Sequence, residues 1–132
     1  MNNDNEFVMK VLIPIETSSR ELLYKTYLLS LLAIESFECY FGSKRNISFL
    51  MNKFDNFIYL DKGYHAGVSD KLYKKIKSRN SLVINLDEEG AIDFPDGSTL
   101  KSRYSKQLFE SSEKVLLWGS YQLRLLKNLD LA

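Results

Sequence analysis

The chain has 132 residues, with 18 Lys and Arg against 17 Asp and Glu and a net charge of +1. This length is typical of one domain, and 45% hydrophobic residues suffice for a hydrophobic core. The balanced charge excludes a protein whose main partner is nucleic acid, and the single cysteine, Cys39, excludes an internal disulfide.

The compartment follows from the same features. A lone cysteine is typical of a reducing environment. The polar start of the chain does not resemble a secretory signal, and the longest apolar stretch, residues 27–34, is too short to span a bilayer. We therefore expect a cytoplasmic protein, with peripheral association at the inner face of the membrane left open.

The first predicted strand covers residues 7–15, which are mostly apolar and β-branched. Ser18 and Glu21 have the spacing of a capping box, so a helix is predicted from Ser19 to residue 34. Because apolar side chains cover most of its faces, we expect this helix to be buried.

The remaining chain continues the alternation of strands and helices. Residues 93–103 contain Pro95 and Gly97 and are predicted as a loop. Further strands are predicted at 37–41, 56–60, 81–86 and 114–118, and further helices at 46–54, 69–79, 105–110 and 121–129.

This alternation is typical of a parallel sheet covered by helices on both faces. We therefore predict an α/β fold, a three-layer Rossmann-like sandwich with a mostly parallel sheet of about five strands. The prediction is one domain over residues 1–132.

In such sheets, ligands bind beyond the carboxyl ends of the strands. The first stretch at such a position holds Glu16, Ser18, Ser19 and Arg20, at the start of a predicted helix where N–H groups and the helix dipole favour anions. It has no glycine, so a nucleotide fingerprint is absent. The alternative is a capped helix with Arg20 paired to a nearby acid.

The second stretch is Asp87-Glu88-Glu89-Gly90, directly after the fourth predicted strand. Carboxylates there can act as general base, nucleophile or metal ligand. Gly90 allows a sharp turn that fixes their direction. A solvated acidic turn is the alternative, but the position at the ligand edge favours function.

Two further stretches follow the third and fifth predicted strands. Lys62 is suited to an anionic sugar or phosphate, and His65 is the only histidine; for both, a structural role is favoured. Trp118 could stack on a sugar, but we interpret it as a core residue with its indole N–H satisfied locally. No Cys/His cluster, P-loop or calcium loop occurs, so no metal site is predicted.

Four pieces of the chain, VLIPIETSSREL, YLDKG, LDEEG and LLWGSYQ, together resemble the N-terminal domain of bacterial surface carbohydrate biosynthesis proteins. These resemble two-domain GT-B glycosyltransferases and are distantly similar to the capsule and lipopolysaccharide β-Kdo transferases. The resemblance implies two Rossmann-like domains with the active site between them. The N-terminal domain would offer acceptor contacts and an acid.

The resemblance also implies roles for residues. Glu89 matches the transferase acid that precedes a glycine, with Glu in place of Asp, which makes it the candidate nucleophile or base; Glu88 and Asp87 would support it. Glu16, Ser18, Ser19, Arg20, Lys62 and His65 would contact substrate. No cofactor is expected in this chain, since the nucleotide-sugar donor would bind the second domain, which we expect to lie outside residues 1–132.

The leading hypothesis is therefore an acceptor-side glycosyltransferase domain, incomplete without its second half. Its partners would be a glycan or glycolipid acceptor and a second Rossmann-like domain or chain; self-association to cover an apolar patch is a further expectation. The alternative is a non-catalytic Rossmann-like module that binds a small anion or a partner protein. A metal-dependent hydrolase using the three acids is a weaker third.

Overall fold

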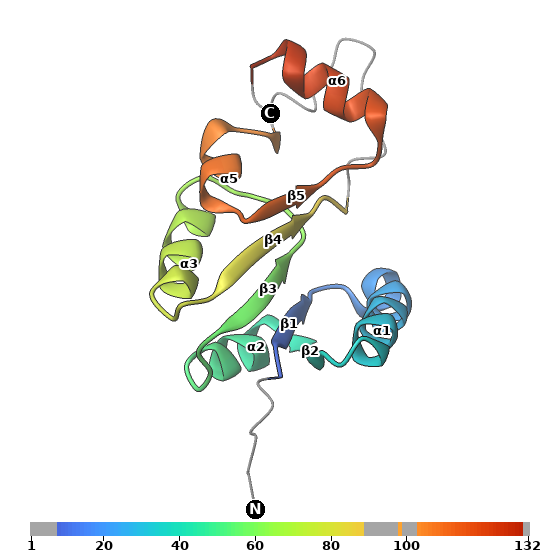
Figure 1. The fold of residues 1–132 in the computed structure, drawn as a ribbon, viewed down its shortest axis with the longest axis vertical. Helices are drawn as coiled ribbons and strands as arrows, with labels where there is room; N and C mark the ends of the chain where they lie inside the picture. The colour runs from blue at the N-terminus through green and yellow to red at the C-terminus, as the bar shows by residue number, and fades with distance from the viewer. Residues whose placement is uncertain (1–7, 89–97, 99–102, 131–132) are drawn as a thin grey trace, which may run out of the picture.

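The computed structural model describes residues 8–88, 98 and 103–130. Five strands form one sheet in the order β2-β1-β3-β4-β5, and all neighbouring pairs are parallel. The predicted α/β fold with a five-stranded parallel sheet is thereby confirmed (Figure 1). The strands are β1 (Lys10–Ile15), β2 (Glu38–Ser43), β3 (Phe57–Asp61), β4 (Leu82–Leu86) and β5 (Lys114–Leu116), and the helices are α1 (Ser18–Ile34), α2 (Lys44–Met51), α3 (Val68–Lys77), α5 (Lys106–Ser111) and α6 (Ser120–Asn128).

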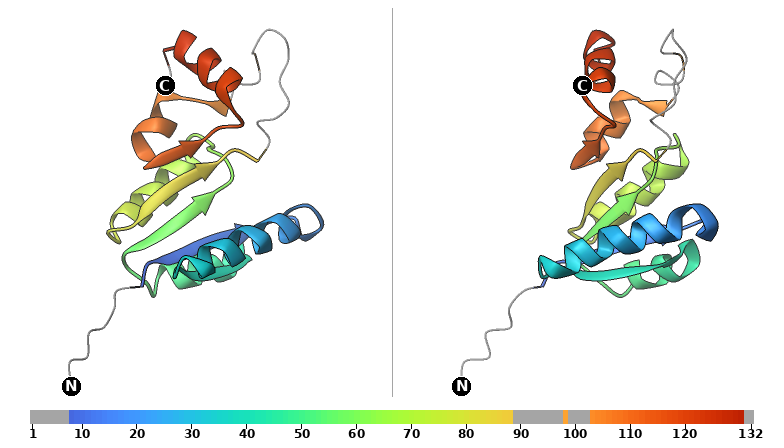
Figure 2. Two further views of the ribbon diagram at one scale, coloured as in Figure 1. Left: turned by 45° about the vertical axis from the view of Figure 1, so that its right-hand side comes forward. Right: turned by 90° about the vertical axis from the view of Figure 1, so that its right-hand side faces the viewer.

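Helices lie on both sides of the sheet, with α1 on one side and α2 and α3 on the other (Figures 1 and 2). Successive side chains of a strand point to opposite faces. Accordingly Val11 and Ile13 of β1 pack with Leu29 of α1, whereas Leu12 packs with Ile47 of α2. A third core cluster forms around Tyr104, Leu108 and Leu126.

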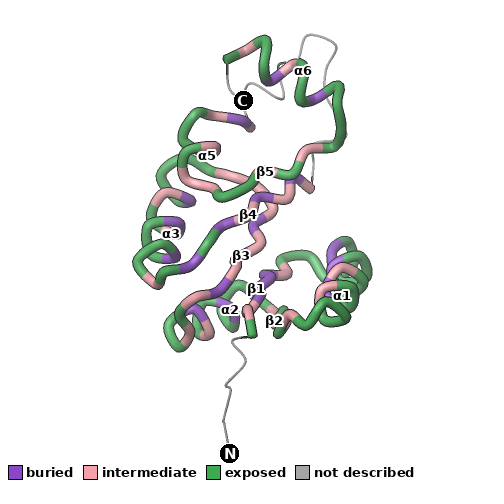
Figure 3. Tube along the Cα trace, viewed as in Figure 1, coloured by how far each residue is buried: buried purple, intermediate pink, exposed green. Residues whose placement is uncertain are grey.

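Helix α1 is far more exposed than its sequence predicts (Figure 3). Only Glu21, Lys25 and Leu29, spaced four residues apart, are buried against the sheet. Leu23 is 86% exposed, and Ile34 is 76% exposed. The prediction of a buried helix was wrong for the described part of the chain, because α1 packs through one narrow stripe and its opposite apolar face meets no described element.

The start of α1 also differs from the predicted capping box. The N-cap residue is Thr17, and its side chain makes no cap hydrogen bond. Instead the Glu21 carboxylate accepts the backbone N–H groups of Glu16 and Thr17, both at 3.1 Å. Glu21 therefore caps the helix from its own first turn, and Ser18 is only the first helical residue.

The strand order places a topological switch point between β1 and β3, since β2 and β3 flank β1 on opposite sides. In doubly wound sheets, a crevice for ligands opens beyond the carboxyl ends of the strands at this point. Glu16 follows β1 there, and Lys62 follows β3. No helix in the described part of the chain is long and apolar enough to cross a membrane.

Candidate functional site

A cavity of about 330 Å³, called the first cavity below, opens beyond the carboxyl ends of β1, β3 and β4. It is lined by five of the residues that the sequence singled out: Glu16, Lys62, His65, Asp87 and Glu88. Arg103, Tyr104 and Asn85 complete its polar wall. Three of the four predicted stretches thus meet in one cavity at the predicted edge of the sheet.

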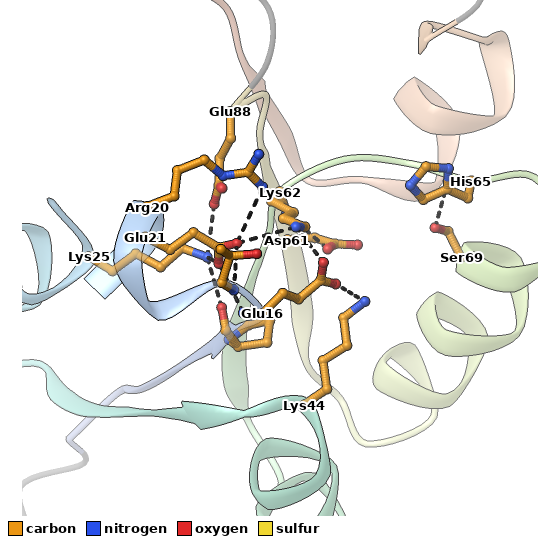
Figure 4. A network of polar contacts seen from close by, with 12 residues as sticks. Glu16, Arg20, Glu21, Lys25, Lys44, Asp61, Lys62, His65, Ser69 and Glu88 are labelled. Carbon is orange, nitrogen blue, oxygen red and sulfur yellow. Dashed lines mark hydrogen bonds and ion pairs between the residues drawn. The ribbon is translucent and has the colours of Figure 1, made fainter. Parts of the chain in front are cut away.

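A buried ion network forms one side of this edge (Figure 4). Lys25 Nζ lies 2.7 Å from Glu21 Oε2 and 2.9 Å from Glu88 Oε1, and it donates to the Pro14 carbonyl at 2.8 Å. Glu21 is fully buried. Burial opposes its ionisation, but the hydrogen bond and charge of Lys25 outweigh burial and hold the pKa of Glu21 below its ordinary value.

Lys62 joins this network to the cavity mouth. Its ammonium pairs with the Glu16 carboxylate and lies 3.3 Å from Glu21 Oε1. Lys44, at the start of α2, pairs with the other Glu16 oxygen. Two lysines, Lys44 and Lys62, therefore alternate with the carboxylates of Glu16 and Glu21 at the switch point. An anionic ligand would have to compete with Glu16 for Lys62.

Asp87, which directly follows β4, has other partners than Glu88. Its carboxylate accepts the Tyr104 hydroxyl, and the Gln122 side-chain amide lies 3.4 Å away. Burial, together with the neighbouring Asp87 carboxylate, raises the pKa of the Tyr104 phenol, so Tyr104 stays a donor. Asp87 is thus held in a fixed direction beside the first cavity.

The other predicted residues lie less centrally. Ser18 and Ser19 are exposed in the first turn of α1 and line neither the first cavity nor the second one described below. Arg20 lies 3.5 Å from Glu21, which fits the predicted pairing with a nearby acid. His65 is exposed, apart from the ion network, and its backbone N–H donates to Ser69 (Figure 4). Glu89, Gly90 and most of the predicted 93–103 loop fall outside the described residues.

Trp118 departs from its predicted core position. Its side chain is 59% exposed, so the core interpretation was wrong. The expected local hydrogen bond is present, because the indole N–H donates to the Asp87 carbonyl. The exposure arises because β5 ends at Leu116 and α6 leads away at the end of the sheet (Figure 1).

Several site residues were missed by sequence reasoning. Lys25 and Glu21 carried a usable signal, since they are an i,i+4 pair of opposite charges in a helix that is mostly apolar after its first turn. Tyr104 and Gln122 carried none. A second buried polar group was also missed: Asp61 accepts the Tyr73 hydroxyl at 2.7 Å, and Asn85 donates to Tyr73 at 2.6 Å. Burial raises the pKa of Asp61.

No protein-family model matches this chain, and neither a curated protein nor a solved structure matches it. Within the residues the structure describes, no group of three or more His, Cys, Asp or Glu side chains is arranged to hold a metal ion.

Proposed function

We propose that the chain is the N-terminal, acceptor-side domain of a GT-B-like glycosyltransferase of bacterial surface polysaccharide biosynthesis. The observation that supports this proposal is the convergence of its four motif stretches. These stretches supply Glu16 and Arg20, Lys62, Asp87 and Glu88, and Trp118. Each of these residues lines one of two adjoining cavities at the carboxyl edge of the sheet. Such convergence is expected when separate motifs serve one binding site.

The chemistry suits an acceptor site. Transfer to a hydroxyl requires a general base to take its proton and polar groups to orient the acceptor. Glu89, which follows the described Asp87 and Glu88, is the proposed base. Lys62 and Glu16 would orient the acceptor hydroxyls or an acidic substituent. The nucleotide-sugar donor would bind a second Rossmann-like domain or chain, and the complex would work at the inner face of the membrane.

The exposed face of α1 fits the need for a partner. Leu23, Tyr27 and Ile34 are each more than half exposed on one helix. Apolar faces of this kind are typical of interaction surfaces. A second domain, a second chain or another copy of this chain would remove them from water.

One observation favours the alternative, a non-catalytic module that binds a small anion or a partner protein. Asp87 and Glu88 already hold partners within the chain, namely Tyr104 and Lys25. These two acids therefore serve the fold, and the catalytic assignment depends most on Glu89.

The proposal is tested in the cells that carry the gene. A deletion strain should lose or shorten a surface polysaccharide, measured by gel profile and sugar analysis, and the wild-type gene should restore it. Glu89→Gln should fail to restore it at normal protein level. Glu35→Gln, an exposed acid at the end of α1, is the matched control and should restore it fully.

Two results would overturn parts of the proposal. An unchanged polysaccharide in the deletion strain would remove the glycosyltransferase role altogether. Full restoration by Glu89→Gln would remove the catalytic acid and leave the binding-module alternative.

A further inference from the structure

A second cavity, of about 340 Å³, lies beside the end of β4 and is lined by Arg20, Tyr24, Leu86, Asp87, Glu88 and Trp118. The first and second cavities share Asp87 and Glu88 as a common wall. The aromatic walls of the second cavity are Tyr24 and Trp118, neither of which lines the first cavity.

Trp118 is exposed but fixed. Its indole N–H donates to the Asp87 carbonyl, and its backbone N–H donates to Gln122 Oε1 at 2.8 Å. Gln122 is itself buried, with 4% exposure. These two hydrogen bonds hold the ring in place while 59% of the residue remains exposed. A ring held this way meets a ligand with little further loss of side-chain entropy.

Tyr24, from α1, supplies the other aromatic wall. Burial and the nearby Glu88 carboxylate raise the pKa of its phenol, so the phenol stays protonated. The indole N–H of Trp118 donates to Asp87, and the Tyr24 phenol lies near Glu88, so both aromatic side chains adjoin the same two-residue segment. The Trp118 wall of the cavity is thereby preorganised.

The charges around these rings indicate the kind of ligand. One guanidinium, from Arg20, and two carboxylates, from Asp87 and Glu88, line the cavity. Sugar hydroxyls both donate and accept hydrogen bonds, so they suit a rim with both signs of charge. A nucleotide base also stacks on aromatic rings, but its phosphate would meet the carboxylates of Asp87 and Glu88 as well as Arg20.

We propose that the second cavity is a carbohydrate subsite in which the apolar face of an uncharged pyranose ring stacks on Trp118. The Arg20 guanidinium and the Glu88 carboxylate contact the hydroxyls of this sugar. Sugar binding at this subsite does not depend on a transfer reaction. The identification of the bound sugar as part of the acceptor rests on the proposed function.

Trp118 is the only tryptophan in the chain and lines this cavity, so tryptophan fluorescence follows binding here. The probes are the methyl pyranosides of glucose, galactose, mannose, rhamnose and N-acetylglucosamine, each titrated to roughly 50 mM to cover the weak affinities of single sugars. UMP serves as the nucleotide probe. We expect at least one pyranoside to change the emission saturably and UMP to bind more weakly.

Variants are read by saturation-transfer NMR, which does not need the fluorophore. Trp118→Ala should lower sugar affinity by about tenfold or more, as expected for the loss of a stacking ring. Arg20→Gln, whose side chain is 55% exposed, should lower it without affecting folding. Phe49→Ala removes an aromatic of similar exposure (61%) from α2 and should change nothing.

The outcomes are distinguishable. The proposal is overturned if no pyranoside binds the folded chain in this range, if UMP binds more tightly than every sugar, or if Trp118→Ala and Arg20→Gln both bind as the wild type does. Because binding is measured on the chain alone, a sugar that binds normally while the deletion strain keeps its polysaccharide would refute the proposed function and leave this subsite standing.

Discussion

Lys25 Nζ lies 2.9 Å from Glu88 Oε1, and this ion pair joins helix α1 to the segment that ends strand β4. The same ammonium also bonds Glu21 and the carbonyl of Pro14 in β1. A single buried cation thus connects three elements at the edge of the sheet that carries the candidate site. Stability and site geometry are therefore coupled through Lys25.

Replacing Lys25 by methionine should be strongly destabilising. The change keeps much of the side-chain volume but removes the buried ammonium that Glu21 and Glu88 share. Removing one partner of a buried pair costs about 3–5 kcal/mol of unfolding free energy. Urea unfolding followed by Trp118 fluorescence measures the loss.

Lys74→Met is the matched control, because Lys74 is exposed on α3. It should change the unfolding free energy by no more than about 0.5 kcal/mol. A loss below about 1 kcal/mol for Lys25→Met would mean that the two carboxylates are hydrated or protonated instead of being held by Lys25.

The pH dependence of stability should report Glu21. Its pKa in the folded chain is held below the ordinary value of 4.5, so the folded state favours the ionised carboxylate. The resulting stabilisation is present above the unfolded pKa and is lost as the pH falls through the lowered folded pKa. Glu21→Gln should therefore be much less stable than the wild type at pH 7, with the difference shrinking below about pH 4. Urea unfolding between pH 3 and 7 tests this, and a constant difference would contradict it.

Asp61 should show the opposite sign. Burial raises the pKa of this carboxyl above its ordinary value of 3.8 despite the hydrogen bond from Tyr73. Its ionised form is disfavoured by folding, so stability is lost as the pH rises from the unfolded pKa through the raised folded pKa. Asp61→Asn keeps an oxygen acceptor for Tyr73 and should be at least as stable as the wild type at pH 7.

That advantage of Asp61→Asn should disappear near pH 3, where the wild-type carboxyl is protonated in both states. Thermal unfolding at the two pH values measures it. A variant that is destabilised by about 2 kcal/mol or more at pH 7 would show that the charged carboxylate is needed there.

Tyr104→Phe should release the Asp87 carboxylate. The variant loses one hydroxyl that donates to a buried acid and leaves the Gln122 amide beside it. A hydrogen bond to a charged group contributes about 1.5–3 kcal/mol, so a loss within this range is expected in urea unfolding. Tyr27→Phe, at a tyrosine that is 67% exposed, should be neutral. Equal stability of both variants would argue that Asp87 is held by other groups.

Local patterns in the sequence predicted most of the strands and helices and the parallel sheet. The strands at Lys10–Ile15 and Leu82–Leu86 and the helix at Val68–Lys77 were predicted to within a few residues. This succeeded because burial on both faces of a parallel strand and on one stripe of a helix leaves a periodic signal in neighbouring residues. The carboxyl-edge rule then placed Glu16, Lys62 and Asp87 at one edge before any strand order was known.

Local sequence patterns were thus enough to predict the element types, the parallel sheet and the edge at which polar residues gather. Which of these residues become neighbours depends on the folded arrangement of the strands. The order β2-β1-β3-β4-β5 brings Lys25 to Glu88 and Tyr104 to Asp87, and the end of β5 leaves Trp118 exposed. Periodicity reflects contacts between residues that are close in sequence. Ion pairs such as Lys25–Glu88 and the exposure of Trp118 instead depend on elements that are far apart in sequence and meet only in the folded chain.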